Sequence, residues 1–141
     1  NLLNRQELWN LFSQAVYFNT LWLDKNVIGF LIALGPGAVY NSPNYRWFEF
    51  RYDQFLYVDR VVIDPVHQGF GYGRMVYDDL REFAVHRFLR ITCEVNLRPK
   101  NERSLRFHQR YGFQQVGVQE TEGGAKQVSL MAYEMPRLFS N

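Results

Sequence analysis

A glycine-rich segment, residues 68–74, carries the clearest chemical signal in this sequence. It reads Gln-Gly-Phe-Gly-Tyr-Gly-Arg and follows an apolar stretch that ends in Asp64-Pro65. Glycine has no Cβ, so its backbone can adopt positive φ angles and bring N–H groups close to a ligand. An amphipathic segment comes next, and the start of a helix offers unpaired N–H groups and the positive end of the helix dipole. This combination predicts a binding site for a phosphate or a pyrophosphate.

Two familiar phosphate-binding motifs do not fit the segment. A dinucleotide-binding GxGxxG motif would need glycine where Arg74 or Val76 stands. A nucleoside triphosphate P-loop would need Gly-Lys followed by Ser or Thr, which this segment does not supply. Both motifs are therefore excluded here.

Acid–base chemistry could come from carboxylates in the strands. Alternation along residues 55–63 places Asp59 on a face with apolar neighbours, so its carboxylate needs a partner or has a raised pKa. A catalytic base and an ion pair with an arginine both explain such a residue. Cys93 is interpreted as a small core residue because no histidine partner lies at a recognisable spacing. One cysteine and three scattered histidines show no metal-ligand spacing, so we expect no metal.

Two ordered motifs resemble the GNAT N-acetyltransferase superfamily. The pattern Q-x-x-G-x-G over residues 68–73, after a strand ending Val-Val-Ile-Asp-Pro, resembles motif A of that superfamily. The pattern C-E-V at residues 93–95, then N-x-x-S at 101–104 and G-F at 112–113, resembles the segment that follows it. The resemblance covers roughly residues 17–135 and is that of a small bacterial-type member.

The resemblance implies an α/β domain with the acyl-CoA N-acyltransferase fold. Its central sheet is mixed but mostly antiparallel and is flanked by helices. The family's first strand and first helix find no counterpart here, so the expected fold lacks them. Either the sequence is a fragment or the remaining sheet tolerates their loss, and both interpretations stay open. We expect residues 1–141 to form a single domain, because their number suits one hydrophobic core.

The same resemblance implies how acetyl-CoA binds. In the family it lies where two central parallel strands splay apart, with its pyrophosphate on the glycine loop. The implied cofactor-binding residues are Val61, Val62, Ile63, Gln68, Gly69, Phe70, Gly71, Tyr72, Gly73, Arg74 and Asn101. Arg103 joins them as a cation well placed in the sequence to meet the phosphates of coenzyme A.

The implied reaction is direct transfer of an acetyl group from acetyl-CoA to a primary amine. Glu94 resembles the acidic residue of protein N-terminal acetyltransferases and is the expected base, with Asp59 as the second candidate. Many relatives carry a tyrosine acid seven residues after the helix-capping asparagine, where this chain has His108. Imidazole can donate that proton. A non-catalytic acyl-CoA sensor is the alternative function.

Periodicity and turn residues predict the elements that position these groups. A helix to about Tyr17 should precede a hairpin of strands at 17–23 and 27–34, and residues 41–44 are interpreted as a turn. The aromatic segment 45–52 that follows is a connection that packs on the core or, less favoured, lines a pocket. The remaining predicted elements are a strand at 55–63, a helix at 75–87, a strand at 89–96, a helix from Asn101 to Gly112, and strands at 113–120 and 126–135.

Composition limits the partners and the location. No apolar run is long enough to span a membrane and no signal peptide is evident, so we expect a cytoplasmic protein with no membrane partner. Half of the basic residues lie between Arg81 and Arg110, and most of them are interpreted as a solvated helix face. Nucleic-acid binding is the rival interpretation of this cluster, but a net charge of only +2 does not suit it, so we expect no nucleic-acid partner. The expected partner is a small-molecule or peptide amine acceptor, and a homodimer is left open.

Overall fold

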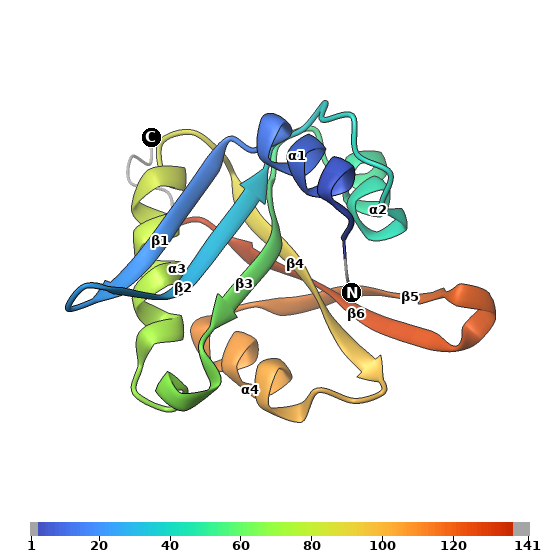
Figure 1. The fold of residues 1–141 in the computed structure, drawn as a ribbon. Coiled ribbons are helices and arrows are strands. Elements are labelled where there is room, and N and C mark those ends of the chain that lie inside the picture. The colour runs from blue at the N-terminus through green and yellow to red at the C-terminus, as the bar shows by residue number, and fades with distance from the viewer. Residues whose placement is uncertain (1–2, 137–141) are drawn as a thin grey trace.

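The structure, a computed structural model, describes residues 3–136. Within this range six strands form one sheet, with helices on both faces (Figure 1). In chain order the elements are α1 (Arg5–Gln14), β1 (Tyr17–Leu23), β2 (Asn26–Leu34), α2 (Pro43–Arg51), β3 (Leu56–Ile63), η1 (Pro65–His67), α3 (Tyr72–Ala84), β4 (Arg90–Arg98), α4 (Glu102–Tyr111), β5 (Gln114–Thr121), η2 (Glu122–Gly124) and β6 (Lys126–Glu134).

The sheet is mixed and mostly antiparallel, as predicted. Its strand order is β1-β2-β3-β4-β6-β5. Every neighbouring pair is antiparallel except the central pair β3 and β4, which is parallel and connected through α3. The predicted fold class is confirmed.

The two central strands separate soon after they begin. Only Leu56 with Ile91 and Tyr57 with Thr92 are paired between them, although β3 continues to Ile63. Beyond these pairs β3 remains bound to β2 and β4 remains bound to β6. The strands therefore diverge toward their carboxyl ends, as Figure 1 shows, and leave two backbone edges without a strand partner on the inner side.

Side chains from the two faces of the sheet form two hydrophobic cores. One core contains Leu56 and Val58 of β3 together with Tyr77 and Leu80 of α3. The other contains Leu11 of α1 and Tyr45 and Phe48 of α2, together with Tyr57 of β3. Helices α3 and α4 thus cover one face of the sheet, and α1 and α2 cover the other, so β3 contributes to both cores.

Helix α2 is the main element that the sequence analysis missed. Residues 41–44 were interpreted as a turn, but the Ser42 hydroxyl accepts a hydrogen bond from the Tyr45 N–H at 3.2 Å and Pro43 follows as the first helical residue. Serine at the N-cap and proline after it are typical helix-start signals. Tyr45 and Phe48 are fully buried, in agreement with the favoured packing interpretation, while Phe50 is 98% exposed.

The start of α3 and the ends of α4 determine where the site lies. Helix α3 begins at Tyr72, three residues before the predicted start, because Gly71 takes the N-cap with a left-handed φ of +85°. Asn101 caps α4 as predicted, by accepting a hydrogen bond from the Ser104 N–H at 3.2 Å.

Within the described residues, no helix has both the length and the apolar character needed to cross a membrane.

The short pairing between β3 and β4 predicts an uneven sensitivity to mutation along β3. Leu56→Ala is expected to lower the free energy of unfolding by about 2–5 kcal/mol, because this side chain is completely buried where the two strands meet. Val62→Ala, at the splayed end and 43% exposed in the native protein, should cost less than about 1 kcal/mol. Urea unfolding measures both values. Equal losses would show that the splayed end is packed as tightly as the junction.

Candidate functional site

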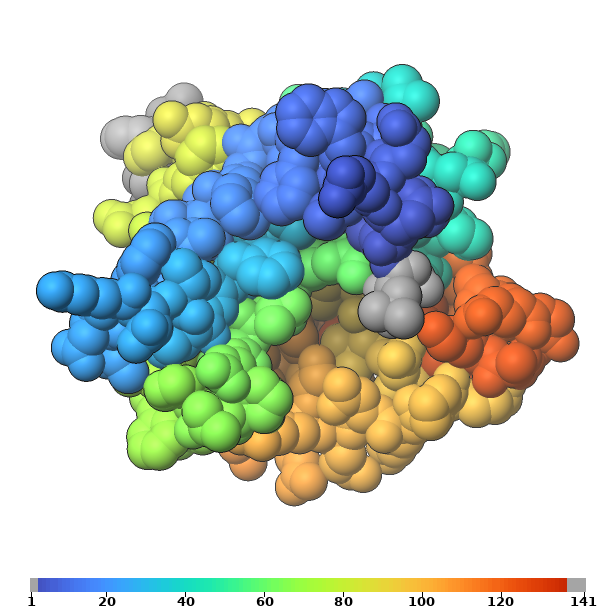
Figure 2. Space-filling model, in the orientation of Figure 1, coloured from blue at the N-terminus to red at the C-terminus, as the bar shows by residue number. Residues whose placement is uncertain are grey.

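Two cavities occupy the opening between β3 and β4. The larger, of about 800 Å³, is called here the cleft cavity and is lined by Tyr40, Asp59 and Glu94 among other residues. The smaller, of about 360 Å³, is called the loop cavity and lies beside the glycine loop 68–74. Figure 2 shows a hollow between α1 and α4. Both cavities share the lining residues Val61, Tyr77, Asn101, Ser104 and His108.

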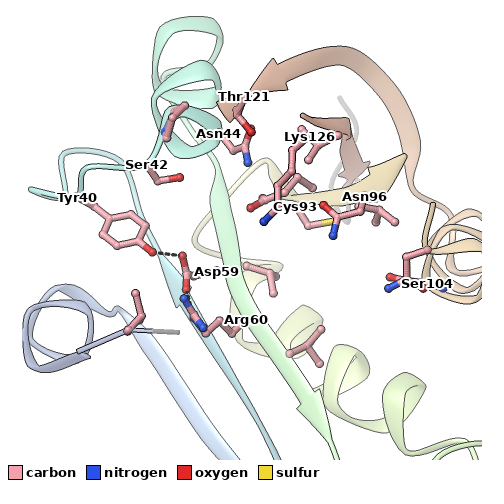
Figure 3. Close-up of a pocket in the computed structure, with 18 of the residues that line it drawn as sticks. Tyr40, Ser42, Asn44, Asp59, Arg60, Cys93, Asn96, Ser104, Thr121 and Lys126 are labelled. Carbon is pink, nitrogen blue, oxygen red and sulfur yellow. Dashed lines mark hydrogen bonds and ion pairs between the residues drawn. The ribbon is translucent and has the colours of Figure 1, made fainter. Parts of the chain in front are cut away.

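The cleft cavity reaches both faces of the sheet. Its lining includes Cys93 and Val95, which belong to the core under α3 and α4, and also Val128, which belongs to the core under α1 and α2. Figure 3 shows side chains converging on it from the segment before α2, from β3 and from β4. The opening therefore connects the glycine loop on one side with the carboxylates on the other.

The glycine loop has the geometry expected of an anion cradle. Gly69 and Gly71 have φ angles of +87° and +85°, which favour glycine. No side chain caps the N-terminus of α3 at Gly71, and a Cβ built there would meet nothing within 4 Å. Open space in front of uncapped helical N–H groups, at the positive end of the helix dipole, suits a phosphate group.

Cations and amides surround this cradle. Arg103 donates a hydrogen bond from Nη1 to Gln68 Oε1 at 3.2 Å, and the Gln68 amide donates from Nε2 to the Ile63 carbonyl at 3.1 Å. Arg74 lies over the ring of Tyr111, with its guanidinium carbon 5.2 Å from the ring centre. Arg74 and Arg103 both line the loop cavity.

The predicted strand contacts also line the opening. Val61 lines both cavities, Val62 the cleft cavity and Ile63 the loop cavity. All three pair with β2 and have no partner on β4, so one backbone edge faces the opening. Of the remaining predicted cofactor residues, Gln68, Gly69, Gly71, Tyr72, Gly73 and Asn101 line the loop cavity. Phe70 is 71% exposed and lines neither cavity.

Glu94 is a partly buried carboxylate in the cleft cavity. The Tyr57 hydroxyl lies 2.8 Å from both of its carboxylate oxygens. Burial, which disfavours the charged form, raises the pKa of Glu94 to about 7, while the hydrogen bond from Tyr57 opposes this shift and the charge of Asp59 adds to it. A carboxyl group with a pKa near neutrality can take up and release a proton under physiological conditions.

Asp59 is also in the cleft cavity but is already paired. Its Oδ1 accepts a hydrogen bond from the Tyr40 hydroxyl at 2.5 Å, drawn as a dashed line in Figure 3, and its Oδ2 lies 3.0 Å from Arg60 Nε. Its side chain is only 6% exposed. The sequence left two explanations open for Asp59, a catalytic base and an ion pair with an arginine, and the structure shows the ion pair with Arg60.

His108 is buried where the two cavities meet. Its Nδ1 lies 2.7 Å from the Ser104 carbonyl oxygen, and its Nε2 lies 2.7 Å from the Tyr77 hydroxyl. Burial lowers the pKa of His108, so the imidazole is neutral at physiological pH. The structure therefore places His108 at the opening, but with both ring nitrogens engaged.

Sequence reasoning missed three tyrosines that contact the predicted residues: Tyr40 on Asp59, Tyr57 on Glu94, and Tyr77 on His108. Strand alternation could have placed Tyr57 on the face of Asp59, but its partner lies on another strand. Tyr77 lies on α3, and only the packing of α3 against α4 reveals its contact.

Within residues 3–136, no group of three or more His, Cys, Asp or Glu side chains is arranged to hold a metal ion.

Comparisons with known proteins agree with this geometry. A profile of the Acetyltransferase (GNAT) family matches residues 2–113. Naa20 from Chaetomium thermophilum, solved with a bisubstrate analogue, is similar with a TM-score of 0.72 at 15% identity, over 96% of this chain and 75% of that one. A GNAT family acetyltransferase from Elizabethkingia anophelis, solved with acetyl-CoA bound, gives 0.70 at 12% identity over 94% and 84%. IAA acetyltransferase from Bacillus cereus gives 0.69 at 13% identity over 94% and 85%. Comparison with curated protein sequences gave no match.

Removal of the Tyr57 hydroxyl should change the titration of Glu94. The phenol hydrogen bond stabilises the ionised carboxylate, so Tyr57→Phe is expected to raise the pKa of Glu94 above about 7, by about one further unit. Carboxyl ¹³C chemical shifts measured against pH in glutamate-labelled protein give the midpoint directly. Tyr40→Phe is the matched control, because that hydroxyl contacts Asp59. A midpoint unchanged by Tyr57→Phe contradicts the assigned hydrogen bond.

The raised pKa of Glu94 also predicts a pH-dependent cost in stability. Between its ordinary value of 4.5 and about 7, the folded protein holds a proton that the unfolded chain has released, so stability falls as pH rises through this window. Glutamine does not titrate. The free energy of unfolding of Glu94→Gln relative to wild type should therefore rise by about 3 kcal/mol between pH 4 and pH 8. Urea unfolding across this range tests it, and a constant difference would show that the carboxyl group is not desolvated.

Proposed function

Because this chain belongs to the GNAT acetyltransferase family, we propose that it is an acetyl-CoA-dependent N-acetyltransferase that transfers the acetyl group directly to a primary amine. One observation carries the proposal. The glycine loop with the uncapped start of α3 lines one cavity, the partly buried carboxylate of Glu94 lines the other, and the two cavities share five lining residues between β3 and β4. A donor held at the loop and an acceptor held near Glu94 would meet between the strands.

The loop cavity fits the coenzyme A part of the donor. The uncapped N–H groups at the start of α3 would bind the pyrophosphate, and Arg74 and Arg103 would contribute positive charge beside it. The inner edge of β3 at residues 61–63 has backbone groups without a strand partner, and these would pair with the amides of the pantetheine arm. This arrangement would direct the thioester toward the junction of the two cavities.

The cleft cavity would hold the acceptor amine. It opens beside α1 and the segment before α2, where its lining is rich in amides and hydroxyls such as Asn10, Ser42 and Asn44. A primary amine must lose a proton to attack the thioester carbonyl. The carboxylate of Glu94, with a pKa of about 7, is a base of suitable strength and lies on the wall of this cavity.

Asp59 is proposed to support the acceptor site. Its charge is balanced by Arg60 and it accepts the Tyr40 hydroxyl proton, so it is less available than Glu94 to remove a proton. It holds Tyr40 against the cavity wall and contributes negative potential, which favours an approaching ammonium ion and adds to the raised pKa of Glu94. We therefore retain Glu94 as the base and Asp59 as the second candidate.

One observation favours a second function, a non-catalytic acyl-CoA sensor. The residue that replaces the usual tyrosine acid, His108, has both ring nitrogens occupied and is neutral. A sensor would bind coenzyme A tightly in calorimetry and release no thiol with any amine. Turnover with one amine excludes this alternative.

Thiol release from acetyl-CoA over a panel of primary amines tests the proposed enzyme. Glu94→Gln is expected to lower kcat by about 10²- to 10⁴-fold, because glutamine cannot accept the proton of the attacking amine. Calorimetric binding of acetyl-CoA should be unchanged, since Glu94 lines only the cleft cavity. Glu82→Gln, on the exposed face of α3, is the matched control. Full activity in Glu94→Gln would contradict the assigned base.

A further inference from the structure

We propose that Tyr77, rather than His108, gives the proton to the departing coenzyme A thiolate, and that His108 positions the Tyr77 hydroxyl. This inference rests on the proposed acetyl transfer and names a catalytic group on α3 that the sequence motifs do not indicate. It follows from three observations: the hydrogen bonds of His108, the place of Tyr77 between the cavities, and the chemistry of its neighbours.

The hydrogen bonds of His108 fix its tautomer. A carbonyl oxygen can only accept, so the contact of 2.7 Å between Nδ1 and the Ser104 carbonyl requires that Nδ1 carries the hydrogen. The neutral ring then has a bare lone pair on Nε2, which accepts the Tyr77 hydroxyl hydrogen at 2.7 Å. In this state His108 has no proton to offer to the opening, although it lines both cavities.

Tyr77 is the neighbouring group that does hold a transferable proton. Among the tyrosines of the described residues, it alone lines both the cleft cavity and the loop cavity. Its side chain is completely buried, and its ring packs against the rings of Phe107 and Phe113, with centroid distances of 5.6 Å to each. In the proposed complex the thioester sulfur lies against the Tyr77 hydroxyl at the junction, and rotation about the C–O bond turns the hydroxyl hydrogen from His108 toward it.

The proton balance of the reaction closes with these residues. The amine nitrogen bonds to the acetyl carbon, the carbon–sulfur bond breaks, and its electron pair leaves with sulfur. Glu94 takes the proton of the amine, and the Tyr77 hydroxyl gives its proton to the thiolate. The phenolate of Tyr77 then recovers a proton from Glu94 through water in the cleft cavity, so the net change moves one proton from nitrogen to sulfur.

The groups around Tyr77 keep it protonated until it is used. Cys93 and Glu94 on β4 and Tyr111 on α4 act on it electrostatically, and His108 on α4 accepts its hydroxyl hydrogen. No positively charged group is among them in the neutral-histidine state. Burial and these neighbours raise the pKa of the Tyr77 phenol well above its ordinary value, so the phenol remains protonated throughout the physiological range.

The first experiment compares Tyr77→Phe with Tyr17→Phe in the thiol-release assay. Tyr17→Phe also removes a hydroxyl contact with α3, the one to Asp79, but Tyr17 lines neither cavity. We expect Tyr77→Phe to lower kcat by about 10²-fold with little change in the KM for acetyl-CoA, and Tyr17→Phe to stay within about twofold of wild type. If Tyr77→Phe keeps its kcat while His108→Ala loses it, His108 is the donor and the proposal is wrong.

A second variant separates chemistry from packing. Site-specific Tyr77→3,5-difluorotyrosine keeps the ring, the hydroxyl and the contact with His108, but fluorine lowers the pKa of a phenol. The acid must keep its proton to act, so activity is lost as pH rises through its pKa. We expect the alkaline fall of kcat to move to lower pH in this variant. An unmoved profile overturns the proposal, even if Tyr77→Phe proves unstable.

The same assay distinguishes this proposal from the proposed function. If wild-type protein releases no thiol with any amine, the acetyl transfer itself is refuted and the role of Tyr77 with it. If wild type turns over and both Tyr77 variants behave like wild type, only the role of Tyr77 is refuted.

Discussion

The whole site depends on how little backbone pairing joins β3 and β4. Two residue pairs hold the parallel strands together, and beyond them each strand is held by its outer antiparallel neighbour instead. Each strand is thus held on its outer side by the rest of the sheet. The separation of the two strands leaves backbone N–H and C=O groups facing a cavity, which is tolerable only where water or a ligand can satisfy them. The same separation allows one cavity to reach both faces of the sheet.

Burial has opposite effects on the two acid–base groups near this opening. It raises the pKa of the Glu94 carboxyl into the neutral range and lowers that of the His108 imidazole. Both shifts disfavour charge, as expected for groups withdrawn from water. A tyrosine hydroxyl is paired with each group, because a phenol can donate to the carboxylate of Glu94 and equally to the bare nitrogen of His108. The hydroxyls of Tyr57 on β3 and Tyr77 on α3 thereby influence which groups in the cavity hold a proton.

The sequence predicted the sheet and the loop well because their signals are local. Strand alternation, the glycines at 69 and 71 and the Asn101 cap each depend on neighbours within a few residues. Helix α2 was missed although Ser42 and Pro43 signal a helix start, because the aromatic run after them lacks an amphipathic pattern. The partners of Asp59, Glu94 and His108 were not predictable, since each contact joins residues far apart in the chain. The exposed side chain of Phe70 likewise depends on the direction of the loop, which the motif does not encode.

The close approach of β2 to β3 has a consequence for how this chain can vary. A Cβ added at Gly29 would lie 2.6 Å from the carbonyl oxygen of Val62, so even alanine there would push against the backbone of β3. That stretch of β3 is the wall of the opening on its inner side. A substitution at Gly29 on β2 would thus change the width of the opening by displacing Val62 and Ile63, which line it. Gly29 therefore acts as a spacer between β2 and β3, and the width of the opening depends on a residue that does not itself line it.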